Sequence, residues 1–406
     1  MTANRYQRVA PSGPLAGVRI LDAAHVIAGP GIATRLSDFG AVVIKVEHPK
    51  RGDTTRSLGW EANEATMWWK HLGRNKRSLT LDLADPHGQE IFVKLAAQSD
   101  VVVESFRPGT MERWNLGPDQ LMPGNPNLIY VRVSGFGQTG PSAGKPGFGT
   151  LAEALSGFVH MTGFPTQPPV LPPIALADEI SALVGAFGVM VALYHRDHPG
   201  GSGQVIDVAL TESLLQLLGP LPLAYDVLGV IPERTGNQLP YAAPRGAYRA
   251  SDGRWIALSG TSQSVALRVL RLVGGPDLAS DPRFASNQAR LANVDELDRL
   301  ISEWVGGRER DEALRIFEVS DVAAAPIYDI RDVFEDPQYA ARGSLVSIDD
   351  PDIGLVRTVA PQPQLSVTPA AIRHLGRRLG ADTDEVLREL GYDNTAIAEL
   401  HQGEVV

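Results

Sequence analysis

The chain has 406 residues, 43% of them hydrophobic, and it is longer than the roughly 250 to 300 residues at which single hydrophobic cores stop growing. Lysine and arginine total 37 against 47 aspartates and glutamates, and this net charge of −10 argues against nucleic acid as a partner. The absence of cysteine excludes disulfides, thiolate metal sites and a cysteine nucleophile.

The first part of the chain alternates strands and helices. Residues 17–25 (GVRILDAAH) predict a buried strand, and a Gly-Pro-Gly turn separates them from a helix between Ile32 and Phe39. Further strands are expected at residues 41–49, 78–83, 100–106 and 127–135, with a helix at 88–99. Strands that alternate with helices predict an α/β fold with a parallel sheet.

A long apolar segment follows. Residues 180–196 are hydrophobic nearly all round, which predicts a buried helix, and the segment is too short and too rich in glycine for a membrane span. A strand at 205–210 and a helix at 211–219 complete this part. The amino-terminal residues lack the apolar core of a signal peptide, so we expect a cytoplasmic protein.

A proline-rich stretch divides the chain into domains. We expect a large domain at residues 1–219, a linker at 220–245 and a small domain at 246–328, which opens with a hairpin around Ser251-Asp252-Gly253. Residues 329–406 are expected to form a second linker and a carboxyl-terminal part that returns to the large domain. Within it, residues 383–400 predict an amphipathic helix.

The first turn resembles a dinucleotide-binding fingerprint, which leaves a nicotinamide-dependent oxidoreductase open as an alternative. Gly29 and Gly31 have the spacing of its first two glycines, and Glu47 ends the next strand, where a ribose ligand would lie. Two features weaken the match. Thr34 replaces the third glycine, and Pro30 removes a backbone N–H from the turn.

Asp178 lies directly before the long apolar segment, in the sequence PPIALADEISALVG. Its plain interpretation is a helix N-cap. A helix N-terminus would also keep the carboxylate ionised, and an ionised carboxylate attacks without a base to deprotonate it. The sequence has no H-E-x-x-H pair, so no metal site is expected.

Several collinear blocks resemble the class III CoA-transferases, the family of the formyl-CoA and carnitine CoA-transferases. The resemblance covers residues 14–406 and is carried by PLAGVRILDAAHVIAGPGIATRLSDFGAVVIKVEHPKRGDTTR, NKRSLTLDL, ESFRPGTMERWNLG, VSGFGQTGP and ALADEISALVGAFGVMVALYHR.

The resemblance implies a Rossmann-like large domain with a parallel sheet and a smaller α+β domain, in an interlocked-ring homodimer. It implies coenzyme A and acyl-CoA as substrates, small carboxylic acids as their partners, and no permanently bound cofactor. It also assigns Asp178 as the nucleophile that forms a covalent aspartyl intermediate, since Ala177-Asp178-Glu179-Ile-Ser-Ala182 matches the family context. The adjacent Glu179 is the less favoured candidate for the nucleophile.

The resemblance also carries over positions that contact CoA in the family. These are Val26, Ala28, His48, Leu81, Ser105, Phe106, Arg113 and Lys145. Arg113 matches most securely, whereas His48 and Ser105 replace an arginine and an asparagine found in other members.

Two departures from related sequences concern the active site. A branch of the same fold racemises 2-methylacyl-CoA thioesters with a histidine, and Phe148 stands at that position here. One of the two groups that exchange the α-proton is therefore missing, and CoA transfer is favoured over racemisation. At the next residue, Gly149 replaces a frequent aspartate and removes a carboxylate. A non-catalytic CoA-binding protein remains the third alternative.

Overall fold

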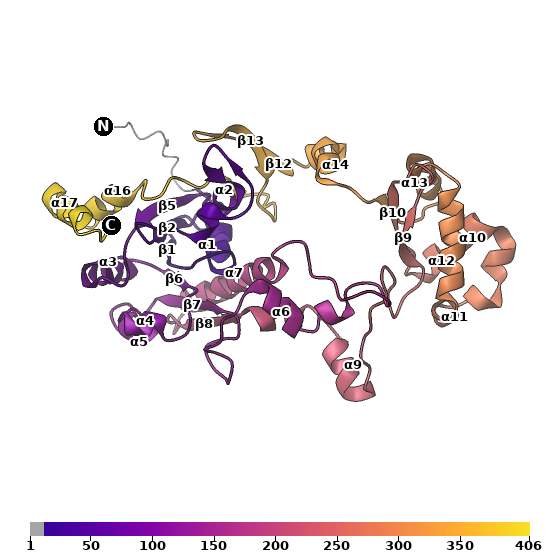
Figure 1. The fold of residues 1–406 in the computed structure, drawn as a ribbon, viewed down its shortest axis with the longest axis horizontal. Helices are drawn as coiled ribbons and strands as arrows, with labels where there is room; N and C mark the ends of the chain where they lie inside the picture. The colour runs from indigo at the N-terminus through magenta and orange to yellow at the C-terminus, as the bar shows by residue number, and fades with distance from the viewer. Residues whose placement is uncertain (1–11) are drawn as a thin grey trace. The chain divides into compact units, whose positions relative to one another are not determined.

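The structure, a computed structural model, describes residues 12–406, which divide into two compact units (Figure 1). The first unit comprises residues 12–158, Leu171–Gly219 and Ala341–Val406. The second comprises Val159–Val170 and Pro220–Ala340. Each unit has its own hydrophobic core and is built from stretches that are separate in the sequence.

A six-stranded sheet forms the centre of the first unit. Its strands are β1 (Arg19–Asp22), β2 (Val42–Glu47), β5 (Lys76–Thr80), β6 (Val101–Glu104), β7 (Ile129–Ser134) and β8 (Val205–Ala209). They lie in the order β5-β2-β1-β6-β7-β8, and every neighbouring pair is parallel. The predicted parallel sheet is confirmed, and its strand order is that of a Rossmann fold.

Helices cover both faces of this sheet, because successive strand residues point to opposite sides. Ile20 packs into one core and Leu21 into the other. The Ile20 face is covered by α1 (Ala28–Asp38), α6 (Gly149–Leu155), α7 (Leu176–Arg196) and α8 (Leu210–Gln216). The Leu21 face is covered by α3 (Pro86–Ala96), α4 (Thr110–Arg113), α5 (Pro118–Leu121), α16 (Thr383–Glu389) and α17 (Asn394–Gln402).

The Gly-Pro-Gly segment is part of α1, so the predicted turn before Ile32 is wrong. The helix begins at Ala28, and its first turn tolerates Pro30 because the first backbone N–H groups of a helix have no partner within it. A Cβ on Gly31 would lie 2.8 Å from the Cβ of Ala182 in α7. The glycine therefore allows two helices to approach closely.

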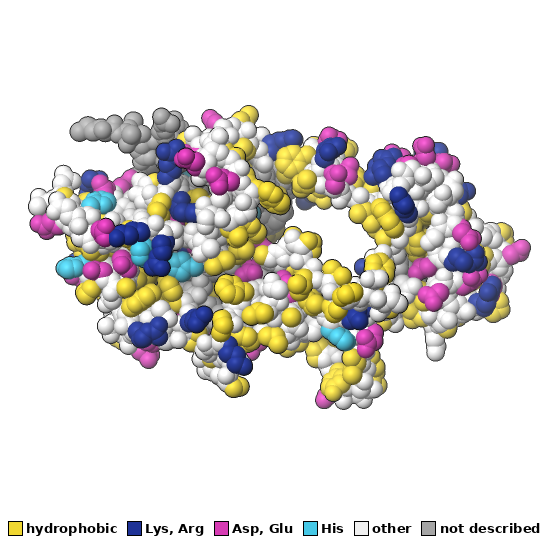
Figure 2. All heavy atoms as spheres, in the orientation of Figure 1, with side chains coloured by type: hydrophobic (Ala, Val, Ile, Leu, Met, Phe, Trp, Pro, Cys, Tyr) yellow, Lys and Arg dark blue, Asp and Glu magenta, His cyan; other side chains and the backbone are white. Residues whose placement is uncertain are grey.

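The long helix α7 begins at Leu176, four residues earlier than expected, and it is not buried all round. One side packs on α1, whereas Phe187 and Tyr194 on the other side are each 70% exposed. Among the described residues, α7 is also the one helix with the length and hydropathy to cross a membrane, a test that core helices of soluble proteins pass too. Figure 2 shows apolar side chains on the face that carries α6 and α7.

The carboxyl-terminal segment covers the edge strand β5. The backbone N–H groups of Ser78 and Thr80 donate hydrogen bonds to the side chains of Asp382 and Thr383, at 2.8 and 2.9 Å. The single helix predicted at 383–400 is instead the pair α16 and α17, because Gly391 takes a left-handed conformation between them.

Short elements complete the first unit. They are the 3-10 helix η1 (Thr54–Ser57), α2 (Met67–Leu72), and the antiparallel pairs β3 (Glu61–Ala62) with β4 (Ala65–Thr66) and β12 (Leu345–Asp350) with β13 (Gly354–Val359).

The second unit combines a small antiparallel sheet with helices. Its sheet has the order β11-β10-β9, and the predicted hairpin is confirmed by β9 (Arg245–Arg249) and β10 (Trp255–Ser259), with Gly253 left-handed in the turn. Ile256, Ile301 and Phe317 lie in its core. The remaining elements, with α15 at the boundary, are η2 (Val159–Met161), α9 (Leu221–Leu228), α10 (Gln263–Ser280), η3 (Pro282–Phe284), α11 (Asn287–Ala292), α12 (Val294–Gly306), α13 (Arg310–Val319), β11 (Ala324–Pro326), α14 (Ile330–Glu335) and α15 (Pro337–Ala341).

Candidate active site

Asp178 lies in the first turn of α7, as its third residue, and is not the N-cap. The N-cap is Ala175, whose side chain makes no capping hydrogen bond. The capping interpretation of Asp178 is therefore wrong. The side chain of Asp178 is half-buried, and none of the described lysines or arginines forms an ion pair with it.

The start of α6 packs against the carboxylate of Asp178. A Cβ on Gly149, the first residue of α6, would lie closer than 3.0 Å to Oδ2 of Asp178. Only glycine leaves room for the carboxylate at this position. One turn further along α6, the buried Glu153 accepts a hydrogen bond of 3.2 Å from the backbone N–H of Ala177.

Burial and two neighbouring carboxylates raise the pKa of Asp178 from its ordinary value of 3.8 to about 6. Burial is the largest cause, and the charges of Glu153 and Glu179 add to it. Glu179 forms an ion pair with Arg35 of α1, so its own charge is compensated. The pKa is raised although Asp178 lies at a helix N-terminus, and with a pKa of about 6 the carboxylate is still mostly ionised at neutral pH.

A pocket of about 320 Å³ lies beyond the carboxyl ends of four adjacent strands of the sheet. It is lined by residues that follow or end β1, β2, β5 and β6, which is where open α/β sheets bind ligands. These residues are Ala23, His25, Val46, Glu47, His48, Arg51, Gly52, Thr54, Leu81, Asp82, Leu83, Ala84, Phe106 and Trp114.

Aromatic side chains form one wall of this pocket. The rings of His25 and Phe106 meet edge to face at 4.8 Å, and those of Phe106 and Trp114 at 5.0 Å. Burial, and after it the charge of Lys45, lowers the pKa of His25 to about 4, so its imidazole is neutral at physiological pH. The wall is therefore uncharged and suited to a flat ring system.

Buried ion pairs lie beside this pocket, since Asp22, Lys45 and Asp53 are each next in sequence to a residue that lines it. Lys45 lies 3.1 Å from a carboxylate oxygen of Asp53, and Lys76 donates to Asp22 at 2.8 Å. Burial opposes ionisation of Asp53, but Lys45 and the hydrogen bonds from Thr55 outweigh it and lower the pKa of Asp53 to about 2. These buried charges are paired with one another, and the ion pairs hold the ends of β1 and β2 together.

The structure brings some of the expected CoA contacts into this pocket and leaves others outside it. His48, Leu81 and Phe106 line it. Ser105 accepts a hydrogen bond of 2.7 Å from the backbone N–H of His25, and so supports the wall from behind.

The other four expected contacts lie elsewhere in the first unit. Val26 and Ala28 are at the start of α1, Arg113 ends α4 beside the pocket residue Trp114, and Lys145 is exposed on the loop after β7. Arg113 donates to the carbonyl oxygen of Gly109 at 3.0 Å.

Glu47 does not serve as a free ribose ligand. Both of its carboxylate oxygens accept hydrogen bonds from Arg56, at 2.6 and 2.8 Å. Gly29 and Gly31 both lie within α1, where Gly29 approaches Ala24 and Ser105 closely and Gly31 approaches Ala182 of α7. Neither half of the dinucleotide-binding interpretation therefore holds.

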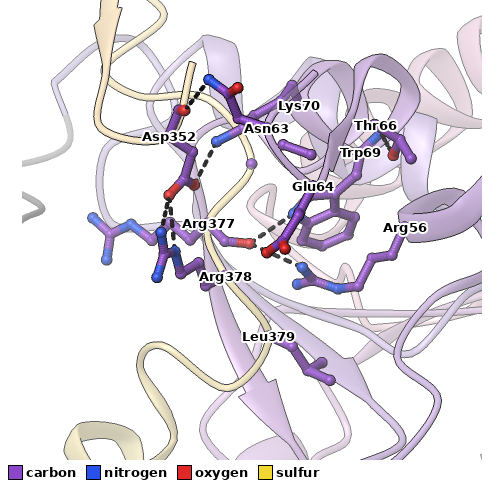
Figure 3. Close-up of a pocket in the computed structure, with 12 residues that line it drawn as sticks. Arg56, Asn63, Glu64, Thr66, Trp69, Lys70, Asp352, Arg377, Arg378 and Leu379 are labelled. Atoms are coloured by element: carbon purple, nitrogen blue, oxygen red, sulfur yellow. Dashed lines mark hydrogen bonds and ion pairs between the residues drawn. The ribbon is translucent and has the colours of Figure 1, made fainter. Parts of the chain in front are cut away.

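A second cavity, of about 260 Å³, lies where α2 meets the carboxyl-terminal segment (Figure 3). Arg56 stacks over the ring of Trp69 at 3.6 Å, and the indole N–H of Trp69 donates to the carbonyl oxygen of Arg377 at 2.7 Å. Lys70 and Arg378 both bind the carboxylate of Asp352. Arg56 and Arg377, which also line the cavity, form ion pairs with Glu47 and Asp382 outside it.

Comparison with known proteins supplies the family. A sequence model described as CoA-transferase family III matches residues 15–383. The chain belongs to this family. It is 40% identical to the succinyl-CoA–D-citramalate CoA-transferase of Chloroflexus aurantiacus, over 98% of this chain and 99% of that one. It is 33% identical to the human succinyl-CoA:glutarate CoA-transferase, over 97% and 90% of the two chains.

A solved structure gives the same answer for the fold. The CAIB/BAIF family protein from Brucella suis superimposes with a TM-score of 0.82 at 32% identity, over 93% of this chain and all of that one. The predicted family is thus confirmed, and the protein is an enzyme that transfers CoA. No group of three or more metal-binding side chains occurs in the part of the chain that the structure describes.

Sequence reasoning missed three residues of this candidate site. His25 had a usable signal, because it closely follows a buried strand at the end where ligands bind. Gly149 was noted only as a lost carboxylate, and its close approach to Asp178 appears only in three dimensions. Glu153 gave no signal, since its contact with α7 joins residues 24 positions apart.

Proposed function

We propose that this family III CoA-transferase works through a covalent intermediate on Asp178. The observation that carries the proposal is the carboxylate itself, which is half-buried, faces Gly149 at the start of α6, and has no cation paired with it among the described residues. A carboxylate with a pKa of about 6 is more basic than an ordinary aspartate, and therefore a better nucleophile that is still ionised at pH 7.

The proposed reaction begins with attack of an Asp178 oxygen on the thioester carbonyl of the donor. The C–S bond breaks, CoA leaves as the thiolate, and a mixed anhydride forms. The thiolate then attacks the aspartyl carbonyl, the anhydride C–O bond breaks, and the donor acid leaves as its carboxylate. The product of this half is an aspartyl-CoA thioester.

The acceptor carboxylate repeats these steps in reverse order. It attacks the aspartyl-CoA carbonyl and expels the thiolate, which attacks the acceptor carbonyl of the new anhydride and releases Asp178 as the carboxylate. No proton or water is consumed. Water would hydrolyse each intermediate, so the site must exclude it during turnover.

The pocket beyond β1, β2, β5 and β6 is proposed to bind the nucleotide end of CoA. Its His25–Phe106–Trp114 wall offers a neutral aromatic surface for a base, and Arg51 supplies a cation for phosphate. Arg113 and Lys145 are proposed as further phosphate contacts on the strength of the family resemblance.

For the acids, we propose succinyl-CoA as donor and a short dicarboxylate as acceptor. Relatives named as succinyl-CoA transferases to D-citramalate, L-malate and glutarate support this choice. A mass-spectrometric screen of donor and acceptor pairs tests it. The proposal fails if monocarboxylates such as acetate accept CoA faster than malate, citramalate and glutarate.

The active form is proposed to be a homodimer of interlocked subunits. The exposed apolar side of α7 supports this proposal. Its exposed side chains recur at helical spacing and form an apolar stripe, which a partner chain would bury away from water; they are Leu183, Phe187, Val191 and Tyr194.

The substitution Asp178→Asn tests the covalent mechanism. An amide is a poor nucleophile of nearly the same shape, so transfer should fall by ~10⁴-fold or more while CoA binding is retained. Wild-type enzyme incubated with acyl-CoA should also gain a hydroxylamine-sensitive adduct on the peptide that contains Asp178. Glu179→Gln, one residue along the helix, is the control and should keep the adduct. Retention of more than about a tenth of wild-type transfer by Asp178→Asn would contradict the mechanism, since that loss is under ~1.4 kcal/mol of barrier.

A further inference from the structure

Glu153 is a buried carboxylate beside the nucleophile. Its residue is only 2% exposed, and no ion pair joins it to a lysine, arginine or histidine of the described residues. A buried charge without a cation is costly, so such a group is retained only where other contacts stabilise it or where it has a task.

The contact that Glu153 does make is with the start of α7. Its Oε1 accepts the backbone N–H of Ala177, the second residue of the helix, at 3.2 Å. The first N–H groups of a helix have no partner within it, and Ala175 at the N-cap position has no side-chain oxygen to offer. Glu153 therefore caps α7 from a neighbouring helix, and it fixes the turn from which Asp178 projects.

The charge of Glu153 also acts on Asp178. Of the groups that face Asp178, Glu153 comes from α6 and Glu179 from the same turn of α7, and Arg35 of α1 neutralises Glu179. Glu153 is thus the uncompensated negative charge next to the nucleophile. After burial it is the largest cause of the raised pKa of Asp178.

We propose that Glu153 is a positioning residue that holds the first turn of α7 in place and, by its charge, favours the acylated form of Asp178 over the free carboxylate. The inference rests on the covalent intermediate proposed above. Its physical basis is that protonation and acylation both remove the negative charge of Asp178. A fixed negative neighbour therefore favours both, and by the same factor.

Two variants separate the charge of Glu153 from its hydrogen bond. Glu153→Gln keeps an acceptor oxygen in place and removes the charge. Glu153→Asp keeps the charge but is one methylene shorter, so it loses reach to the N–H of Ala177. Glu212→Gln is the control, because Glu212 is an exposed carboxylate in the first turn of the neighbouring helix α8.

Two measurements are made on each enzyme with the same acyl-CoA. They are the pH at which kcat/KM falls on the acidic side, and the ratio of aspartyl-CoA adduct to free enzyme at equilibrium, obtained by mass spectrometry. In Glu153→Gln the acidic limb should move to lower pH by at least about 0.5 unit, and the adduct ratio should fall by the matching factor of about 3. In Glu153→Asp the limb should stay in place while kcat falls. Glu212→Gln should match the wild type in both.

A purely structural role predicts a different pattern. It lowers kcat of Glu153→Gln equally at every pH and leaves the limb and the adduct ratio unchanged, and this result would overturn the inference. If Glu153→Gln does not fold, Glu153→Asp decides, because a limb shifted to lower pH with unchanged kcat contradicts both proposed roles. Failure of the mechanism itself is distinguishable, since the wild-type enzyme would then carry no adduct on the Asp178 peptide.

Discussion

At the residue scale, two opposing effects act on Asp178. The helix N-terminus favours its charged form, whereas burial and the carboxylates of Glu153 and Glu179 favour the neutral form. The second set prevails. The folded enzyme therefore holds Asp178, the proposed nucleophile, in a charged state that lowers folding stability at neutral pH.

This cost predicts that removing the charge stabilises the protein. The folded-state pKa of Asp178, about 6, lies above its ordinary value of 3.8, so ionised Asp178 destabilises the fold above pH 6, and the effect disappears as the pH falls toward 3.8. Asp178→Asn should therefore be more stable than wild type at pH 7.5 and unfold at a higher temperature. The gain in unfolding free energy should be at most about 3 kcal/mol. Calorimetry of both proteins at pH 7.5 and pH 4 measures this. A stability difference between Asp178→Asn and wild type that is the same at both pH values would contradict the raised pKa.

Gly149 gives a second prediction at this scale. In Gly149→Ala the new Cβ would meet Oδ2 of Asp178 closer than 3.0 Å, so the carboxylate must rotate away from its position. If Asp178 is the nucleophile, as proposed, its displacement by about 1 Å should lower kcat on the order of 10²-fold.

The control for Gly149→Ala is Gly124→Ala in the same unit. There the added Cβ would lie 3.6 Å from the nearest atom, the carbonyl oxygen of Leu121, which is ordinary contact. This variant should retain wild-type activity. Steady-state transfer assays on both decide, and equal activities would show that the approach to Asp178 is not needed.

At the element scale, the pairing of α1 with α7 positions Asp178, the proposed nucleophile. Gly31 on α1 and Gly185 on α7 allow the two helices to approach closely, and the ion pair of Arg35 with Glu179 crosses the same interface. Small residues at a helix crossing bring the backbones together, so the first turn of α7 is fixed relative to the end of β1.

Two glycines of α7 make a matched test of this packing. The Cβ of Gly185→Ala would lie closer than 3.0 Å to Cδ1 of Ile32, which overpacks the crossing and should destabilise the protein by about 1 to 3 kcal/mol. The Cβ of Gly188→Ala would lie 3.5 Å from Ile206, which is ordinary contact. This variant should stabilise the protein by up to ~1 kcal/mol through helix propensity. Denaturant unfolding compares the two variants with the wild type. A change in unfolding free energy of the same sign for both would contradict the close packing at Gly185.

At the scale of the whole molecule, the exposed side of α7 predicts the oligomeric state. The 43.6 kDa chain should sediment at twice its mass at micromolar concentration, and Phe187→Asp should weaken that association and lower transfer activity. A charge in the centre of an apolar interface is desolvated without a partner, and it therefore disfavours assembly.

The control for Phe187→Asp is Val319→Asp on α13. Val319 is also highly exposed, but it stands alone rather than in a helical stripe. This variant should sediment and react like the wild type. A stable and fully active wild-type monomer would contradict the proposed homodimer.

The sequence by itself determined the elements whose signals are local. Short runs of valine and isoleucine predicted the parallel strands, and the hairpin at Gly253 was correctly placed, because a β-turn is specified by adjacent residues. Where α7 starts and where α16 stops depended on caps and a left-handed glycine, which hydropathy does not report. The family and the identity of Asp178 as candidate nucleophile followed from motif order.

Only the tertiary structure decided the environment of Asp178, the proposed nucleophile. That Asp178 faces Gly149, that Glu153 caps α7, and that Glu47 is bound by Arg56 are contacts between residues distant in sequence, or between side chains whose directions a motif does not give. The exposure of one side of α7 is of the same kind. A helix that is apolar all round can be covered on one side by its own chain and on the other by a partner, and composition does not separate the two sides.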